Sequence, residues 1–131
     1  MKILQPISKF LLWTSYILQG LVSLMFLNGA IQNLLKTDMA VEGIKTFGFP
    51  ESSLLYFGLI LLISTVLYLM PKTAVLGAIL LTGWLGGAVA THIVHGDPVF
   101  NIFLPVIFGL IVWISIWLRF EGLRQITPVA K

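Results

Sequence analysis

The chain has 131 residues, of which 58% are hydrophobic and only 10% are charged, and its formal net charge is +3. A soluble domain has about a quarter of its residues charged, so these few charges cannot cover a surface that faces water. We therefore expect most of the surface to face lipid. The basic residues are scattered rather than clustered, which argues against a nucleic-acid interface. The absence of cysteine excludes disulfides, thiolate nucleophiles and iron–sulfur clusters in this chain.

Four uncharged apolar segments follow one another, at residues 10–35, 54–70, 73–94 and 99–118. A helix needs roughly 20 residues to cross a bilayer, and the second segment is near the lower limit of that length. The apolar runs are continuous rather than alternating, which favours helices over barrel strands. The first run is too long for the apolar part of a signal peptide, so we interpret it as a retained helix. We predict an all-α fold, a four-helix integral membrane bundle forming a single domain over residues 1–131.

The short connections contain residues typical of turns and helix ends. The Pro71-Lys72 pair predicts a tight hairpin between the second and third helices. Gly96 suits the position just after a helix end, and Asp97 followed by Pro98 suits the N-cap and first turn of the fourth helix.

The long connection, residues 36–53, mixes apolar and charged side chains. We predict a short amphipathic helix here, between the first two membrane helices, lying on the outer membrane surface. A solvated loop is the alternative.

Basic residues divide unequally between the two ends of the predicted bundle. The end that holds both termini has six of them: Lys2, Lys9, Lys72, Arg119, Arg124 and Lys131. The opposite end has two: Lys36 and Lys45. Because cytoplasmic loops carry the excess of lysine and arginine, we predict a multi-pass protein of the inner cell membrane with both termini in the cytoplasm.

Small residues recur at every fourth position of the third helix. One row contains Ala78, Thr82, Gly86 and Ala90, and a neighbouring row contains Gly83 and Gly87. Small side chains on one helix face allow close helix packing in lipid. We therefore predict close contacts along these rows, with the third helix at the centre of the bundle. The alternative is that the glycines leave room for a flat ligand beside Trp84, which lies near mid-depth.

The third helix and its flanks contain a recognisable series of motifs. These are Pro71-Lys72-Thr73, LGA at 76–78, GGA at 86–88, Thr91-His92 and Gly96-Asp97-Pro98, together with NGAIQNLL, FGFPES and WLRFEGLR elsewhere. In these motifs the chain resembles the DoxX-like family of small four-helix membrane proteins. Gln32 stands where the family usually has lysine, and Leu61 where it often has an acidic residue. The resemblance implies links to respiratory sulfur or quinone redox systems and to oxidative-stress complexes. A quinone is suggested as a cofactor by this resemblance alone.

Several polar side chains are expected at similar depth near the outer end of the bundle. They are Asn28, Gln32 and Asn33 of the first helix, Thr91 and His92 of the third, and Asn101 of the fourth. Polar groups that face lipid are costly, so we predict that these face inward and, with Trp84, form a ligand-binding chamber. The alternative is that polar groups only join helices, which we favour for Ser15, Gln19 and Ser23.

The two histidines are assigned different places. We predict that His92 points into the bundle and contacts at least one of the amides, whereas His95 lies at the water boundary. A metal site needs three or four ligands, and only Asp97 or loop carboxylates could complete a set with these histidines. No metal site is therefore predicted.

Three classes of function remain. The favoured one is a binding or accessory protein in the lipid bilayer, which holds a small amphiphile such as a quinone or lipid, or steadies another membrane or redox subunit. The second is a membrane enzyme with His92 as general base, although no obvious nucleophile, metal or redox group accompanies it. The third is a small transporter acting as a homo-oligomer, but no span contains the acidic residue that would couple protons.

Overall fold

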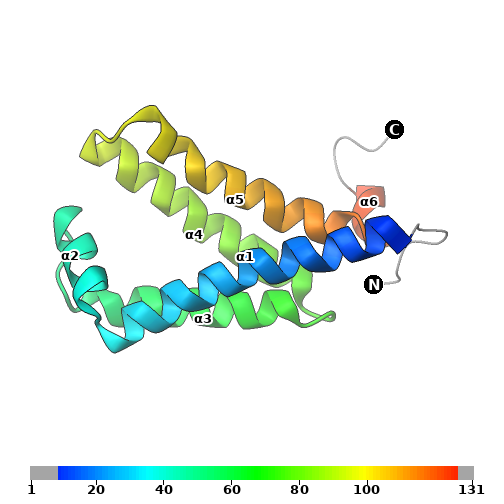
Figure 1. The fold of residues 1–131 in the computed structure, drawn as a ribbon, viewed down its shortest axis with the longest axis horizontal. Coiled ribbons are helices and arrows are strands. Elements are labelled where there is room, and N and C mark those ends of the chain that lie inside the picture. The colour runs from blue at the N-terminus through cyan, green and yellow to red at the C-terminus, as the bar shows by residue number, and fades with distance from the viewer. Residues whose placement is uncertain (1–8, 127–131) are drawn as a thin grey trace.

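The structure of the chain is a computed structural model that describes residues 9–126. The elements in chain order are α1 (Lys9–Leu35), α2 (Asp38–Thr46), α3 (Ser53–Leu69), α4 (Ala74–His95), α5 (Val99–Trp117) and α6 (Glu121–Ile126). The long helices α1, α3, α4 and α5 coincide with the four predicted segments (Figure 1). The predicted all-α helical bundle is therefore confirmed.

The outer faces of these helices are apolar. Large hydrophobic side chains such as Leu21, Ile63 and Ile79 are exposed at mid-helix positions, where they are suited to lipid rather than water. Three helices, α1, α4 and α5, are long and apolar enough to cross a membrane, and α3 is a shorter apolar helix of 17 residues packed beside them. The chain is a multi-pass membrane protein.

The four long helices form a ring in which each has two neighbours. α1 packs against α3 and α5, and α4 packs against the same two helices, so that α1 and α4 lie diagonally and do not pack together. The prediction that the third membrane helix is central is therefore wrong. Figure 1 shows the α1–α3 pair and the α4–α5 pair meeting near α6 and separating toward α2. We call the end with the α3–α4 turn (residues 70–73) the closed end, and the end with α2 and the α4–α5 turn (residues 96–98) the open end.

Close backbone packing at the closed end depends on Gly77. An added Cβ at this position would lie 2.2 Å from the backbone nitrogen of Tyr68, so no side chain fits between α3 and α4 here. The turn itself is short, as predicted, and the hydroxyl of Thr73 donates to the carbonyl oxygen of Leu67 at 2.8 Å. Together these contacts hold α3 and α4 as an antiparallel hairpin.

A buried hydrogen-bond network joins three helices at the closed end. Arg119, just after α5, is 4% exposed and donates to Ser15 Oγ at 2.5 Å and to Gln19 Oε1 at 2.6 Å, both on α1. The Gln19 amide donates to the carbonyl oxygen of Tyr68 on α3 at 2.9 Å. The Tyr68 hydroxyl is hydrogen-bonded to Ser115 on α5. Ser15 and Gln19 therefore join helices, in agreement with the sequence-based interpretation.

Two residues at this end differ from that interpretation. Arg119 was counted only as a cytoplasmic charge, yet its guanidinium lies inside the bundle, 4.4 Å from the ring centroid of Tyr16 and 4.8 Å from that of Phe120. Ser23 was expected to join helices, but its buried hydroxyl has no hydrogen-bond partner in the described part of the chain.

The helix predicted between the first two membrane helices is present as α2, so the solvated loop is excluded. Thr37 caps its first turn, where its hydroxyl accepts a hydrogen bond from the backbone nitrogen of Ala40 at 3.3 Å. Gly48, with φ of +85°, follows the end of the helix in the left-handed conformation. α2 has no fully buried residue and, among the described helices, packs against α1 and α3 alone, so it lies on the bundle rather than in it.

Candidate functional site

A cavity of about 410 Å³ lies at the open end, between α2, α3 and α4. Its lining is mostly aromatic and small: Phe47, Phe49, Phe57, Trp84, Gly83, Gly87 and Ala88, with Ile44 and Ile60. Three polar residues, Asn33, Thr91 and His92, also line it. We call this space the outer cavity, and it has the apolar lining and few polar groups typical of small-molecule sites.

Aromatic rings form a connected wall of the outer cavity. The ring of Phe57 makes edge contacts with Phe49 and Trp84, at centroid distances of 5.2 and 5.4 Å. Phe47 makes edge contacts with both histidines, at 5.1 Å from His92 and 5.0 Å from His95. The segment that follows α2 thus contacts α4 through Phe47. The rings of Phe47, Phe49, Phe57 and Trp84 together border one side of the outer cavity.

The glycines of α4 border open space instead of a neighbouring helix. An added Cβ at Gly83, Gly86 or Gly87 would meet no atom of residues 9–126 within 4 Å. The predicted close packing along these three glycines is therefore wrong. The physical reason is the divergence of the two helix pairs, because α4, which stays beside α5, separates from α3 beyond Leu85, its last buried residue.

The other members of the two small-residue rows differ from one another. Ala78 is fully buried in the core near the closed end, and the Thr82 hydroxyl accepts a hydrogen bond from the indole of Trp113 on α5 at 2.7 Å. Ala90 is exposed, so the predicted contact is wrong there as well. The row packs tightly only in its first half, and Gly83 and Gly87 instead leave room beside Trp84.

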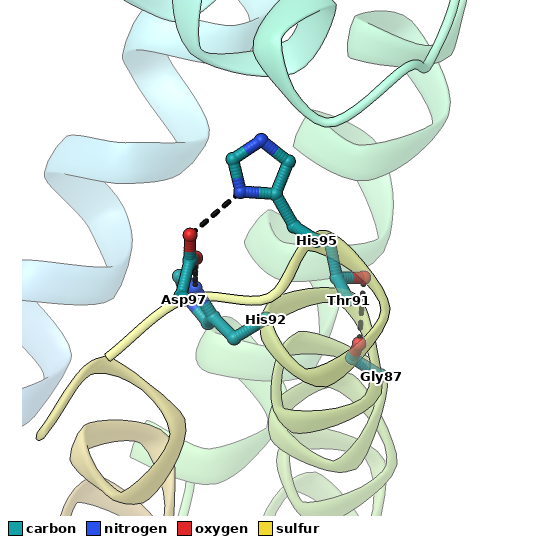
Figure 2. Close-up of polar contacts among 5 residues, drawn as sticks. All are labelled: Gly87, Thr91, His92, His95 and Asp97. Atoms are coloured by element: carbon teal, nitrogen blue, oxygen red, sulfur yellow. Dashed lines mark hydrogen bonds and ion pairs between the residues drawn. The ribbon is translucent and has the colours of Figure 1, made fainter. Parts of the chain in front are cut away.

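The C-terminal turn of α4 brings a carboxylate onto both histidines. Gly96 has φ of +79°, and the backbone nitrogen of Asp97 donates to the carbonyl oxygen of His92 at 3.1 Å, as in a Schellman turn. This turn folds Asp97 back over the helix end. Its Oδ2 lies 2.5 Å from Nδ1 of His92 and its Oδ1 lies 2.6 Å from Nδ1 of His95 (Figure 2).

These contacts correct two sequence-based expectations. Asp97 does not cap the fourth membrane helix, since the N-cap residue of α5 is Pro98 and no side chain caps that helix end. His92 makes no hydrogen bond to the predicted amides within residues 9–126, and its partner is Asp97. Asp97 satisfies His92 from five residues away, which a distant amide cannot do at the end of a splayed bundle. His95 is the more exposed of the two histidines, as expected.

Hydrogen bonds determine the ionisation of this group. The bond to His92, followed by the bond to His95, holds the pKa of Asp97 below its usual value. Asp97 is therefore an ionised carboxylate at neutral pH. Within the described range, no group of three or more His, Asp or Glu side chains is placed to hold a metal ion.

The predicted polar chamber is divided between two spaces. Asn33, Thr91, His92 and Trp84 line the outer cavity. Asn101 lines a second cavity of about 390 Å³ between α1, α4 and α5, where Trp84 and His92 appear again. Asn28 and Gln32 line neither of these cavities. Trp84 and His92 therefore lie between two cavities, whereas the sequence analysis predicted one chamber.

Sequence reasoning missed the aromatic side of the outer cavity and the role of Asp97. Phe47 and Phe49 flank Gly48, and nothing in their spacing indicates which helix they reach. Asp97 could have been found, because a glycine just after a helix end commonly reverses the chain and places the next residue over the last turn.

The family is identified by the sequence comparison, whereas no curated protein and no solved structure matches the chain. The match to the family runs over residues 17–115, which include most of α1 and all of α2, α3 and α4, and extend through α5 to Ser115. Both cavities and the Asp97 carboxylate lie within this range. The chain belongs to the DoxX-like family.

Proposed function

We propose that this protein binds a small amphiphile with a flat ring in the outer cavity, as a binding or accessory protein of a membrane redox system. The observation that carries the proposal is an open space of about 410 Å³ bordered by aromatic rings on one side and by Gly83 and Gly87 on the other. Aromatic edges and faces pack favourably on a flat ring, and glycine lets the ring approach a helix backbone.

The position of the cavity suits entry from the membrane. Ile60 and Gly83 both line it, both are exposed, and they lie near the middle of α3 and α4. The mid-point of a membrane helix is at the depth of the hydrocarbon chains. A ligand dissolved in the bilayer could therefore enter between these helices without crossing the headgroup region.

The polar residues of the cavity lie toward its outer end. Asn33 is two residues before the end of α1, and Thr91 and His92 belong to the last turns of α4. An amphiphile would accordingly place its apolar part at mid-membrane and its polar group near His92. A quinone and a lipid both divide in this way, and the family resemblance favours the quinone.

Filling the cavity tests this proposal. Native mass spectrometry of gently extracted protein should show a bound small molecule, and Gly87→Leu should abolish it because the leucine side chain occupies the space. Gly86→Leu is the matched control, since Gly86 borders a different groove with Pro105 and Gly109. Wild-type protein with no bound molecule, or Gly87→Leu with the same occupancy as Gly86→Leu, would contradict the proposal.

The contact between His92 and Asp97 favours a second candidate function, a membrane enzyme with His92 as general base. A carboxylate on Nδ1 orients the imidazole and stabilises its protonated form, as a general base requires. In that case the molecule bound to His92→Gln should differ in mass from the molecule bound to wild-type protein, because it would remain unconverted. The same mass in both would exclude this candidate.

We also propose that both termini face the cytoplasm of the cell that makes the protein. The unequal division of basic residues supports this orientation. Single cysteines at the exposed positions Glu51 and Lys72 report the two ends, since the chain has no cysteine of its own. A membrane-impermeant thiol reagent should label intact cells at residue 51, and labelling at residue 72 instead would reverse the orientation.

A further inference from the structure

The two ring nitrogens of His92 have different surroundings. Nδ1 is occupied by Asp97 at 2.5 Å, and the other oxygen of the same carboxylate is occupied by His95 at 2.6 Å (Figure 2). Nε2 of His92 has no hydrogen-bond partner among residues 9–126. His92 also lines both the outer cavity and the second cavity.

The shared carboxylate determines which nitrogen carries the hydrogen. An ionised carboxylate can only accept hydrogen bonds, so Nδ1 of His92 must donate to Asp97. A neutral imidazole has a single N–H, and its second nitrogen is then a bare acceptor. His95 donates to the other oxygen of Asp97, so each carboxylate oxygen already accepts a hydrogen bond from a histidine. In the neutral imidazole, Nε2 of His92 is thus fixed as an acceptor.

Among the polar groups of the outer cavity, Nε2 of His92 has the most clearly defined hydrogen-bonding role. The Thr91 hydroxyl donates to the carbonyl oxygen of Gly87 at 2.8 Å, so its hydrogen is already used within α4. The amide of Asn33 can donate or accept and therefore does not distinguish ligands. The Phe47 ring lies perpendicular to the imidazole of His92, with the ring centroids 5.1 Å apart, and restricts the imidazole plane.

We propose that the outer cavity selects ring compounds of the phenol class, whose hydroxyl donates a hydrogen bond to Nε2 of His92, with Asp97 as the positioning residue. This inference rests on the proposed function, because it requires a flat ring in the cavity. An ether oxygen, or the carbonyl oxygen of an oxidised quinone, would face the lone pair of Nε2 with no hydrogen between them. Within the quinone class the site would therefore favour the reduced form, which has phenolic hydroxyls. A site built around a hydrogen bond discriminates strongly against ligands that cannot form it.

The test compares naphthol with its methyl ether, which has the same ring but cannot donate. Affinities are measured at about pH 8, where an ordinary imidazole is neutral, for protein in lipid nanodiscs. Quenching of tryptophan fluorescence gives the signal, and Trp84→Phe shows which part of it comes from the cavity. Wild-type protein should bind naphthol roughly tenfold more tightly than the ether, the ratio expected for one hydrogen bond.

Two variants separate the acceptor from its positioning residue. His92→Phe should bring the affinity ratio close to one while the ether still binds. Asp97→Asn should also lower the ratio, because an amide can either accept from Nδ1 or donate to it and no longer fixes the hydrogen. The affinity for the ether should stay unchanged in Asp97→Asn, which a merely structural effect on the cavity would not allow.

The outcomes distinguish this inference from the proposed function. Equal affinity of wild-type protein for the two compounds would overturn the phenol selectivity and leave the binding function intact. A ratio that survives His92→Phe would overturn the assignment of the acceptor. Failure of both compounds to bind would contradict the proposed function itself.

Discussion

Glycines at the two ends of α4 do opposite things. At the closed end Gly77 brings the backbones of α3 and α4 into contact, whereas from the middle of α4 toward the open end Gly83 and Gly87 border a cavity. In both places glycine removes a side chain, and the neighbouring helix determines whether backbone or empty space takes its place. A row of small residues in a membrane helix therefore indicates that side-chain volume is missing along one face. The distance to the neighbouring helix determines whether that face makes close helix contact or borders a cavity.

Polar groups differ between the ends in the same way. At the closed end the Arg119 guanidinium donates to the Gln19 amide oxygen, and the Tyr68 hydroxyl is hydrogen-bonded to Ser115, so these polar groups find their partners inside the protein. At the open end one nitrogen of His92 is held by Asp97, and the other has no described partner. The closed end is thus suited to holding helices together, and the open end to receiving a ligand.

The largest expected effect comes from the same substitution at the two ends. Gly77→Ala should destabilise the protein by about 3 kcal/mol, because its Cβ would lie 2.2 Å from backbone that cannot rotate away. Gly83→Ala should stabilise it by up to about 1 kcal/mol through helix propensity, since its Cβ meets nothing. Thermal unfolding in detergent measures both, and shifts of the same sign and size would remove the distinction between the ends.

The next effect concerns the buried network. Arg119→Met should cost about 2 kcal/mol, because the buried Gln19 Oε1 loses the hydrogen bond that it accepts from Arg119. Arg124→Met is the matched control, since this arginine is only partly buried: it lies over the Trp117 ring at 4.4 Å and donates to the Trp117 carbonyl oxygen at 3.2 Å. A cation–π contact near the surface is worth about 0.5–1 kcal/mol. Equal losses in the two variants would show that the Arg119 network adds no stability beyond a surface contact.

The sequence predicts the helices well because their signals are local. Continuous apolar runs, Pro71 at a turn and Gly96 after a helix end need no knowledge of distant residues. The prediction of close packing along the small-residue rows failed because contact at Gly83 depends on how far α4 diverges from α3. The burial of Arg119 was not predicted for a related reason. Its position in the sequence indicates a charge at the end of the last membrane helix, but only the fold brings it to Ser15 and Gln19 of α1.

The candidate site was predicted in part for similar reasons. Asn33, Trp84, Thr91 and His92 share the outer cavity, and their depth along each helix was sufficient to group them. Depth does not give direction around the helix, so it does not show that Asn28 and Gln32 line neither cavity or that Asn101 lines the second cavity. The aromatic wall could not be predicted from the sequence, because Phe47 contacts α4 only through the course of the loop that follows α2.

The smallest effect is expected from Asp97 and depends on pH. Hydrogen bonds from His92 and His95 hold its pKa below the usual value for aspartate, about 3.9. A carboxyl group whose pKa is lowered by folding stabilises the folded state above the unfolded pKa, and the stabilisation is lost as the pH falls through the folded pKa. The melting temperature of wild-type protein should therefore exceed that of Asp97→Asn at about pH 6, and this difference should shrink once the pH drops below about 4.

The difference in melting temperature between wild type and Arg119→Met should not change over the same range, because a guanidinium stays charged throughout. A constant Asp97 difference would mean that the carboxylate is not held by the histidines, and the fixed acceptor at His92 Nε2 would lose its cause.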